Sequence, residues 1–344
     1  MQSTCFQNQG QITKKALIEN YRILNDIGKG SFGNVMRAES KMYPGKFVAV
    51  KTLRSKIGSP KDFCRLREYS FFANVPKHPN LANCYEMFIN SYTAGAVFIL
   101  ELADMNLLQP IVWHRECGPL PICTYDVATL TRDLLLGTAH IHKFGYVHRD
   151  IKPENILLKF MSDGTTSVKI ADFGLSKRLD SESSRWTSYV ATRWYRAPEQ
   201  LLEIGNHTTA LDVWSVSLVM CELCNLRPLL PGETATEMLQ YQVDYLGLPD
   251  QFGLSDVEVN MRLKVEEGAF AKRRAPGLPM ITKNKMHRVF ESFIRLGLEW
   301  NPSDRPSASQ MAQYLEHLLC TEIKENTVPI KTTPLEQKRR CYSL

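Results

Sequence analysis

The segment from His148 to Asn155 reads His-Arg-Asp-Ile-Lys-Pro-Glu-Asn and gathers side chains that can handle a phosphoryl group. Asp150 can accept a proton from a hydroxyl, Lys152 can neutralise a phosphoryl group in transfer, and Asn155 can hold a metal ion. A purely structural loop has no need to combine a carboxylate, an ammonium group and an amide at this spacing. The segment therefore predicts phosphoryl-transfer chemistry.

A second acidic motif follows, where residues 169–174 read Lys-Ile-Ala-Asp-Phe-Gly. It places Asp172 just beyond a segment that is expected to form a strand. Mg²⁺ is a hard ion that prefers oxygen ligands. Asp172 and Asn155 can supply such oxygens from opposite sides, so the two motifs together predict a magnesium site.

Glycines between Gly28 and Val35 follow the pattern G-x-G-x-x-G-x-V. Alone this pattern is weak, because dinucleotide sites and plain hairpins also use glycine-rich turns. A dinucleotide site would open a helix, whereas strands are expected on both sides here. Backbone amides at a hairpin tip can approach phosphate oxygens, since glycine has no Cβ to block them. The context favours a hairpin that covers phosphates.

Lys51 lies at the end of the expected strand that contains Val48-Ala49-Val50. A single lysine is more often a solvated surface charge. Glu68, however, follows in a helical stretch, and a lysine that bridges ATP phosphates needs such a carboxylate to hold its flexible stem. The two residues are therefore expected to pair.

Local patterns divide the chain into a strand-rich part and a helical part. Strands are expected at 21–27, 33–39, 46–53 and 96–102, and helices at 62–74 and around 127–141. The helix at 62–74 should stop before Val75, because a residue that precedes proline disfavours the helix. The pattern predicts an α+β fold.

The domain organisation follows from this division. A polar lead-in at 1–20 should precede a small lobe at 21–102 and a larger helical lobe at 103–320. The tail at 321–344 is polar and basic and is expected to have no core of its own. Two lobes suit a chain of 344 residues.

Composition limits the classes of partner and the cellular compartments that suit the protein. Forty-two Lys and Arg against thirty-six Asp and Glu leave a net charge of +6, too mild to indicate a nucleic-acid partner. Nine cysteines without a dense, regular spacing indicate reduced thiols. The longest apolar patch, about 213–226, is too short to span a bilayer, and the N-terminus lacks the apolar stretch of a signal peptide. We expect a protein of the cytoplasm or nucleus, without a transmembrane segment.

The four motifs, in this order, make residues 21–320 resemble a eukaryotic protein kinase. The resemblance implies the two-lobed kinase fold, with ATP and Mg²⁺ as cofactors. It makes Asp150 the catalytic base, supported by Lys152, Lys51 and Glu68, and assigns the metal to Asn155 and Asp172. The residues it implies for ATP binding are Ile27, Gly28, Lys29, Gly30, Ser31, Phe32, Gly33, Val35, Ala49, Lys51, Leu100, Glu101 and Ala103.

The resemblance continues in the helical lobe. An Ala-Pro-Glu sequence that ends at Glu199 would close the activation segment, and Arg305 should pair with Glu199. Asp212 and Trp214 match the buried helix motif of the family. Ser217 stands where glycine is usual, which should affect packing rather than chemistry.

The stretch from Thr187 to Glu199 resembles the group of cyclin-dependent, mitogen-activated and male-germ-cell-associated kinases. This group implies protein substrates with proline after the target Ser or Thr, because Ala191 and Arg196 lie where the family shapes a pocket for an imide nitrogen. It also implies an insert at about 231–285. The helix around Glu68 lacks the cyclin-binding sequence and the tail lacks an acidic docking cluster, so male-germ-cell-associated relatives fit slightly better.

Thr187 and Tyr189 have T-x-Y spacing, which predicts control by an upstream activating kinase. A phosphate adds about −1.5 to −2 charge, and Arg149 is a ready partner for it. The alternative is that both are ordinary exposed loop residues. The competing functions are a pseudokinase scaffold, which the intact motifs oppose, and a small-molecule kinase, which the Ala-Pro-Glu sequence opposes.

Two cysteine patterns resemble functional motifs. Cys221 and Cys224 have C-x-x-C spacing but lie in an apolar helix without a second ligand pair, so packing is favoured over zinc or redox chemistry. Cys341 is the fourth residue from the end and has basic neighbours. Lipidation there would give weak membrane association, although the two residues after it are poor matches for the motif.

Overall fold

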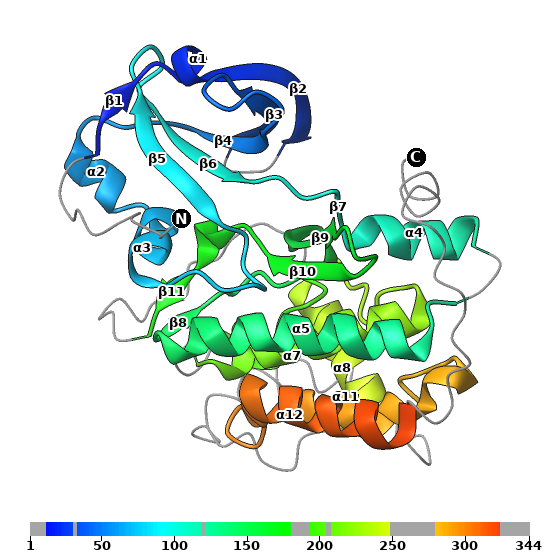
Figure 1. Cartoon of the computed structure of the whole chain (residues 1–344). Helices are drawn as coiled ribbons and strands as arrows, with labels where there is room; N and C mark the ends of the chain where they lie inside the picture. The colour runs from blue at the N-terminus through cyan, green and yellow to red at the C-terminus, as the bar shows by residue number, and fades with distance from the viewer. Residues whose placement is uncertain are drawn as a thin grey trace.

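The computed structural model describes residues 12–29, 33–118, 121–179, 193–203, 208–247 and 279–323. A twisted sheet with short helices forms one lobe, and a larger helical lobe lies beneath it (Figure 1). The chain passes between the lobes after residue 101, where the last long strand of the upper lobe ends. The α+β, two-lobed fold expected from the sequence is confirmed.

The upper lobe, or N-lobe, contains a six-stranded sheet in the order β1-β5-β6-β4-β3-β2. Its strands are β1 Lys14–Lys15, β2 Tyr21–Lys29, β3 Gly33–Ser40, β4 Phe47–Lys56, β5 Cys84–Asn90 and β6 Gly95–Glu101. All neighbouring pairs are antiparallel except β1 with β5. Val48, Ala49 and Val50 are buried, as expected for a strand that packs on both faces.

The helix expected at 62–74 is two helices, α2 Pro60–Cys64 and α3 Arg67–Asn74. The expectation was wrong because Leu66 adopts an extended backbone between them, at φ −62° and ψ 132°, and packs into a core cluster of the N-lobe. Tertiary packing thus overrides helical propensity at this point. The predicted end is confirmed, since Val75 before Pro76 is again extended.

Three N-lobe elements, β5, β1 and the helix at 17–20, were not predicted. Strand β5 was missed because its sequence, Cys-Tyr-Glu-Met-Phe-Ile-Asn, does not alternate cleanly between polar and apolar residues. Part of the expected polar lead-in also joins the lobe, since β1 and the helix α1 Leu17–Asn20 pack on the sheet and Leu17 is buried.

The lower lobe, or C-lobe, is built around a central helix. Its α-helices are α4 Leu108–Glu116, α5 Thr124–Lys143, α6 Pro198–Leu201, α7 Ala210–Asn225, α8 Ala235–Leu246, α11 Glu291–Gly297 and α12 Ala308–Leu318. Every residue of α7 from Ala210 to Cys224 is buried, as expected of a mostly apolar helix at the centre of a lobe. Cys221 and Cys224 lie within this core, as packing requires.

Short strands and turns line the top of the C-lobe. The strands are β7 Met105–Asn106, β8 Tyr146–Val147, β9 Ile156–Phe160, β10 Thr166–Ile170 and β11 Lys177–Arg178. Two short 3₁₀ helices, η1 Pro153–Asn155 and η2 Phe173–Leu175, lie among these strands. Lower in the lobe, the 3₁₀ helix η3 Lys285–Phe290 precedes α11, and the π-helix η4 Leu319–Ile323 follows α12. Leu319 and Ile323 are buried, so the fold extends slightly past the expected boundary at residue 320.

Ser217 on α7 faces Gly297 at the end of α11. The Ser217 hydroxyl donates to the carbonyl of Val213 at 2.9 Å. A Cβ on Gly297 would lie 1.9 Å from Ser217 Oγ, so the glycine is required by the serine. This close contact between two helices explains how the core accommodates the departure from the family at Ser217.

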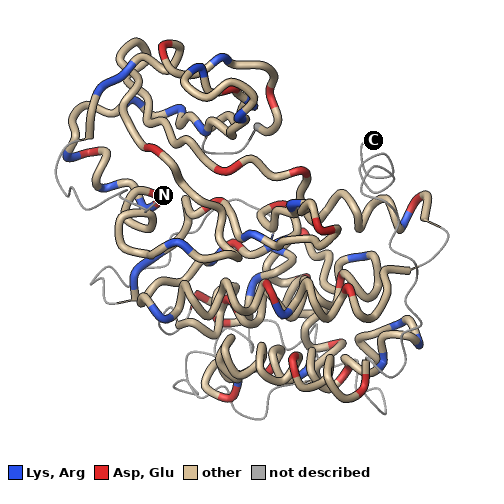
Figure 2. The backbone as a smooth tube through the Cα atoms, viewed as in Figure 1, with Lys and Arg blue, Asp and Glu red and all other residues tan. Residues whose placement is uncertain are grey.

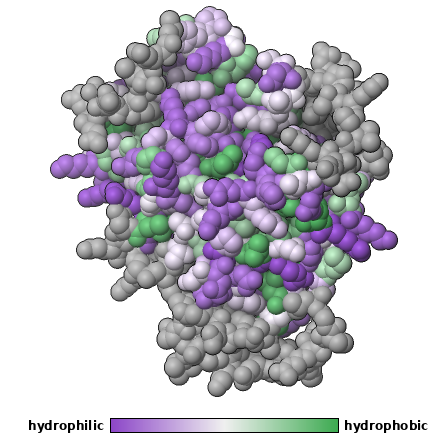
Figure 3. Space-filling view, turned by 60° about the horizontal axis from the view of Figure 1, so that its bottom comes forward, coloured by the Kyte–Doolittle hydropathy of each residue, from purple (hydrophilic) through white to green (hydrophobic). Residues whose placement is uncertain are grey.

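The surface mixes charges and apolar groups. Basic and acidic residues alternate along both lobes rather than forming one large field (Figure 2). On the face seen in Figure 3, green apolar side chains are scattered among purple polar ones. Among the described helices, none combines the length and the apolar character needed to cross a bilayer.

Candidate active site

The register of the sheet aligns the predicted nucleotide residues on adjacent strands. Gly28 lies opposite Val35, and Val35 lies opposite Lys51. Ala49 lies opposite Leu100 on β6 in the same way. The predicted residues thus form neighbouring rows above the junction of the lobes.

Gly33 begins β3 at a position where only glycine fits. A Cβ there would lie 2.0 Å from the carbonyl oxygen of Thr52. The hairpin strand therefore approaches β4 more closely than any side chain allows. Gly30, Ser31 and Phe32 lie outside the described residues, and Lys29 is placed by its backbone alone.

Lys51 contacts two carboxylates from different parts of the chain. Its Nζ lies 2.8 and 2.7 Å from the oxygens of Glu68 on α3, and 2.9 Å from Oδ1 of Asp172. Burial alone would lower the pKa of Lys51, but the two carboxylates outweigh it and raise the pKa. The predicted pairing with Glu68 is confirmed, and Lys51 carries its charge at neutral pH.

Asp172 occupies a left-handed backbone conformation, at φ 62°. Burial would raise its pKa, but the charge of Lys51 and the hydrogen bond from Lys51 lower it instead. The next residue, Phe173, stacks on Phe71 of α3 with ring centroids 3.8 Å apart. The aromatic contact joins the position of Asp172 to the helix that carries Glu68.

The segment predicted to perform the chemistry is a compact loop. Lys152 Nζ lies 3.0 Å from Asp150 Oδ2. Asn155 Nδ2 donates to both the backbone carbonyl and Oδ2 of Asp150, each at 2.8 Å. Because both amide hydrogens of Asn155 are used, its oxygen is the group left for a ligand. The structure therefore brings Asp150, Lys152 and Asn155 together.

The donors at this site suit a magnesium ion. Asp172 offers a carboxylate whose low pKa keeps it ionised, and Asn155 offers an amide oxygen. Mg²⁺ is usually held by one or two such side chains, with water and substrate phosphates as the remaining ligands. The residues fit the ion, since Asp172 and Asn155 both supply oxygen ligands.

Asp212 of α7 fixes the loop from below. Its Oδ2 accepts a hydrogen bond from the amide of His148, and its Oδ1 accepts one from the amide of Arg149, each at 2.8 Å. His142 Nε2 also lies 2.9 Å from Oδ2. Burial would raise the pKa of Asp212, but His142, His148 and the amide of Arg149 lower it. Sequence reasoning placed Asp212 in a buried motif but did not identify its contact with His142.

Glu101 was predicted as one of the residues that bind ATP. Its side chain is buried and contacts lysines of the C-lobe strands, with Lys159 Nζ at 2.7 Å and Lys169 Nζ at 3.2 Å. Asn83 Nδ2 donates to the same carboxylate at 2.9 Å. Burial would raise the pKa of Glu101, but the two lysines lower it. Sequence spacing gave no indication of this network, because its members come from four separate strands or loops.

Basic residues surround Arg149, the predicted phosphate partner. Burial lowers the pKa of Arg149 to about 10, and the charges of Arg67 and Arg196 contribute. Its Nε is buried without a hydrogen-bond partner in the described part of the chain. Lys177 joins the group, since burial and the charges of Arg149 and Arg67 lower its pKa. Arg67 and Lys177 were missed, although each is next to or close to a predicted residue.

Several predicted residues cannot be placed in this cluster. Thr187, Tyr189 and Ala191 lie outside the described residues. Arg196 is described, and burial together with Arg193 lowers its pKa while Asp150 opposes the shift. We call Arg67, Arg149, Lys177 and Arg196 the basic cluster, because each of these residues either affects the pKa of another by its charge or has its own pKa affected by another.

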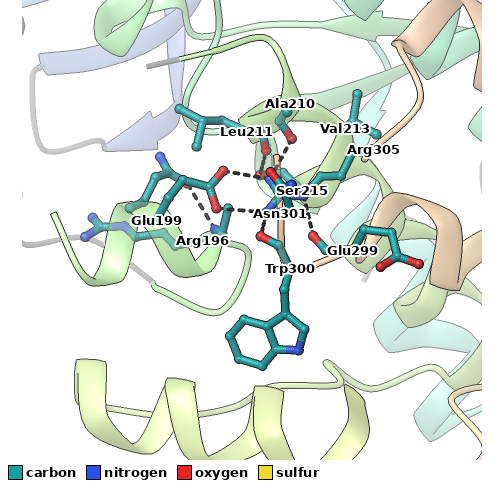
Figure 4. Close-up of polar contacts among 12 residues, drawn as sticks. Arg196, Glu199, Ala210, Leu211, Val213, Ser215, Glu299, Trp300, Asn301 and Arg305 are labelled. Atoms are coloured by element: carbon teal, nitrogen blue, oxygen red, sulfur yellow. Dashed lines mark hydrogen bonds and ion pairs between the residues drawn. The ribbon is translucent and has the colours of Figure 1, made fainter. Parts of the chain in front are cut away.

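Glu199 and Arg305 form the predicted pair in the C-lobe (Figure 4). The two guanidinium nitrogens of Arg305 lie 2.6 and 2.8 Å from the two oxygens of Glu199. The same guanidinium donates to the backbone carbonyls of Glu299, Trp300 and Ala210, and it lies 4.9 Å from the centroid of the Trp214 ring. The buried pair has its remaining donors satisfied, as such a pair must.

Comparisons with known proteins give the same fold. The protein kinase domain family matches residues 21–317. A solved structure of the CAK complex from Chaetomium thermophilum bound to ATP-gamma-S has a chain that aligns with a TM-score of 0.69 at 24% identity, covering 86% of this chain and 90% of that chain.

Curated relatives define the group. The chain is 33% identical to the sporulation protein kinase mde3 of Schizosaccharomyces pombe, covering 93% of this chain and 58% of that protein. It is 30% identical to the MAPK/MAK/MRK overlapping kinase of Homo sapiens, covering 86% and 67% respectively, and 37% identical to cyclin-dependent kinase F-3 of Oryza sativa, covering 86% and 65%. The chain thus spans about three fifths to two thirds of these relatives, and it belongs to the protein kinase family, in the group of serine/threonine kinases that unites the cyclin-dependent, mitogen-activated and male-germ-cell-associated kinases.

Proposed function

We propose that the protein transfers the γ-phosphoryl group of ATP to serine or threonine hydroxyls of protein substrates. The observation that carries the proposal is the meeting of Lys51, Glu68 and Asp172 in one network beside the loop that contains Asp150 and Asn155. These residues come from both lobes. A fold that only bound a partner would not require this set of charges around the junction.

Asp150 is proposed to orient and deprotonate the substrate hydroxyl. General-base assistance of this kind contributes about 10²–10⁴ in rate. Lys152, 3.0 Å from Asp150, is placed to neutralise the phosphoryl group during transfer. Lys51, held by Glu68, is proposed to bind the ATP phosphates, so that positioning and charge neutralisation supply most of the remaining acceleration.

Asn155 and Asp172 are proposed to hold the magnesium ion. When bound, the ion would neutralise charge on the phosphates and help to align them. The contribution of the protein is to keep Asp172 ionised through Lys51 and to orient the Asn155 amide through Asp150.

The substrate preference is proposed to be a Ser or Thr followed by proline. Two observations support this. The named relatives belong to this group, and Arg196 lies close enough to Asp150 for that carboxylate to oppose the lowering of the Arg196 pKa. Such a pocket would select proline because the imide nitrogen has no N–H that must be satisfied.

Phosphorylation of Thr187 by an upstream kinase is proposed to switch the activity. The basic cluster supports this, because burial and the charges of Arg67 and Arg196 disfavour the charged form of Arg149, and a nearby phosphate would favour it. A phosphate would supply about −1.5 to −2 charge. We expect Thr187→Ala to lower kcat by well over tenfold, measured on protein that the activating kinase has phosphorylated; equal activity of variant and parent would contradict the proposal.

The enzymatic proposal is tested with purified protein, Mg·ATP and two peptides that differ only in proline or alanine after the target serine. We expect phosphate transfer at least tenfold faster to the proline peptide. Asp150→Asn should lower kcat by about 10²–10⁴ while the thermal midpoint stays close to that of the parent. If the phosphorylated parent binds ATP but transfers no phosphate to either peptide, the alternative function as a pseudokinase scaffold replaces this one.

Association with a membrane through Cys341 stays a prediction, since this residue lies outside the described part of the chain. A mass spectrum of the C-terminal peptide from cells decides it. An unmodified mass removes the idea.

A further inference from the structure

We propose that residues 12–17 are a built-in partner of the N-lobe, which holds α2 and α3 where Glu68 meets Lys51. The segment adds β1 to the edge of the sheet opposite the glycine-rich hairpin, next to β5. Only the activity readout of this inference rests on the proposed kinase function. The other readouts concern the position of α3 itself.

The segment is attached to the sheet through backbone hydrogen bonds. The amide of Ile89 donates to the carbonyl of Thr13 at 3.1 Å, and the amide of Ser91 donates to the carbonyl of Lys15 at 2.9 Å. The pairing is parallel, unlike that of every other strand in this sheet. A strand edge with free backbone groups attracts another strand, and here the chain supplies one itself.

Side chains of the segment pack on both faces of the sheet. Ile12 packs against a cluster that contains Phe63 of α2. Leu17, 6% exposed, lies in the cluster on the other face together with Phe88. The segment therefore crosses the sheet edge and clamps it, and Figure 1 shows β1 close to α2. Full burial of one such side chain contributes about 1.5–3 kcal/mol.

Glu86 of β5 fixes the position of the segment along the edge. Lys15 forms an ion pair with Glu86. The Tyr21 hydroxyl donates to the other oxygen of Glu86 at 3.2 Å. Partly exposed ion pairs contribute only about 0–1 kcal/mol. The pair therefore specifies where the segment binds, and the apolar contacts provide most of the binding energy.

The cluster that Ile12 joins extends to α3 and to the strand beside Lys51. Phe63 stacks on Phe98 of β6 with centroids 5.6 Å apart, and Phe72 of α3 lies 6.3 Å from the same ring. Phe98 is in turn the residue opposite Lys51. Helix α3 spans eight residues, too short to be stable without packing. Loss of Ile12 should thus loosen α3 and with it the Lys51–Glu68 contact.

The first test compares Ile12→Asp with Ile18→Asp in the full chain. Ile18 is 58% exposed on α1 and serves as the matched control. We expect Ile12→Asp to speed hydrogen exchange of the α3 amides at least tenfold and to raise KM for ATP at least fivefold, with kcat changed less. Ile18→Asp should stay within twofold of the parent in each measurement. Parent-like exchange and KM in Ile12→Asp would overturn the inference.

A charge exchange tests the same segment without removing apolar packing. Lys15→Glu and Glu86→Lys should each speed α3 exchange about threefold or more, while the double variant returns to within twofold of the parent. If Ile12→Asp does not fold, the Lys15 and Glu86 variants provide the test without it. Hydrogen exchange of α3 that stays fast in the double variant would overturn the inference. If the parent transfers no phosphate, exchange and ATP binding still decide, so the two proposals can fail separately.

Discussion

Individual residues in the site act through one another, by charge and by hydrogen bonds, rather than as single groups. Lys51 is held by two carboxylates, and the side-chain amide of Asn155 donates two hydrogen bonds to Asp150. Burial strengthens each of these interactions, because the same low dielectric that penalises an isolated charge strengthens a paired one. Removing one partner therefore affects the others, which is the physical reason to expect large losses from single substitutions here.

Glu222 on α7 is the residue whose titration should be visible in stability. Burial raises its pKa to about 7, while the hydrogen bond from the Tyr195 hydroxyl at 2.6 Å opposes the shift. The folded state therefore binds the proton more tightly than the unfolded state, whose Glu has a pKa of about 4.3. Between these values the stability falls as the pH rises.

We expect Glu222→Gln to reveal this effect, because glutamine stays neutral and can still accept from Tyr195. Each unit of pKa shift corresponds to about 1.4 kcal/mol, so the variant should gain on the parent by about 1–3 kcal/mol between pH 5 and pH 8. Urea unfolding at the two pH values measures it. A difference between variant and parent that does not change with pH would contradict the assignment.

Among the elements, α7 and α11 meet at a contact without free space. Gly297 faces Ser217, whose hydroxyl is held by the carbonyl of Val213. Alanine is normally better than glycine in a helix by about 1 kcal/mol. Here the added methyl group would displace the hydroxyl from its hydrogen bond, and overpacking of this kind costs about 1–3 kcal/mol.

We expect Gly297→Ala to destabilise the protein by about 1–3 kcal/mol, measured by thermal or urea unfolding. Ser217→Gly alone should have a smaller effect. The double variant should recover most of the loss, because the exchange moves the small residue to the other helix. Strictly additive changes would show that the two residues do not interact.

At the scale of the whole molecule, ion pairs connect the two lobes in addition to the covalent chain. Glu101 ends β6 of the N-lobe and is held by Lys159 and Lys169 from the β9–β10 hairpin of the C-lobe. Either lysine alone leaves the carboxylate partly compensated. Losing both would remove two cations from this buried carboxylate and leave it the hydrogen bonds from the backbone and side-chain amides of Asn83.

We expect Lys159→Met with Lys169→Met to destabilise the protein by about 3–5 kcal/mol, the usual result of leaving a buried charge without its partner. Each single variant should lose about half as much or less. Adding Glu101→Gln to the pair should recover part of the loss, since the amide needs no counter-charge. Urea unfolding of the four variants provides the comparison, and no recovery in the triple variant would exclude the charge as the cause.

Local sequence determined the elements and the chemistry of the motifs. The spacing of the loop at 148–155 identified Asp150, Lys152 and Asn155, because short loops bring near neighbours together in any fold. The Lys51–Glu68 and Glu199–Arg305 pairs were also predictable, through the family that the motifs resemble. Alternating and helical periodicity similarly indicated the strands β2, β3, β4 and β6 and the helix α5, whereas β5 and several C-lobe helices were not predicted from it.

Tertiary structure alone decided how distant segments meet. The break at Leu66, the pairing of β1 with β5, and the grip of two lysines on Glu101 depend on side chains far apart in sequence. Periodicity reports which face of an element is apolar, but it does not say which partner will cover that face. The partner is chosen by packing and charge in the folded molecule, where contacts between distant residues outweigh local preference.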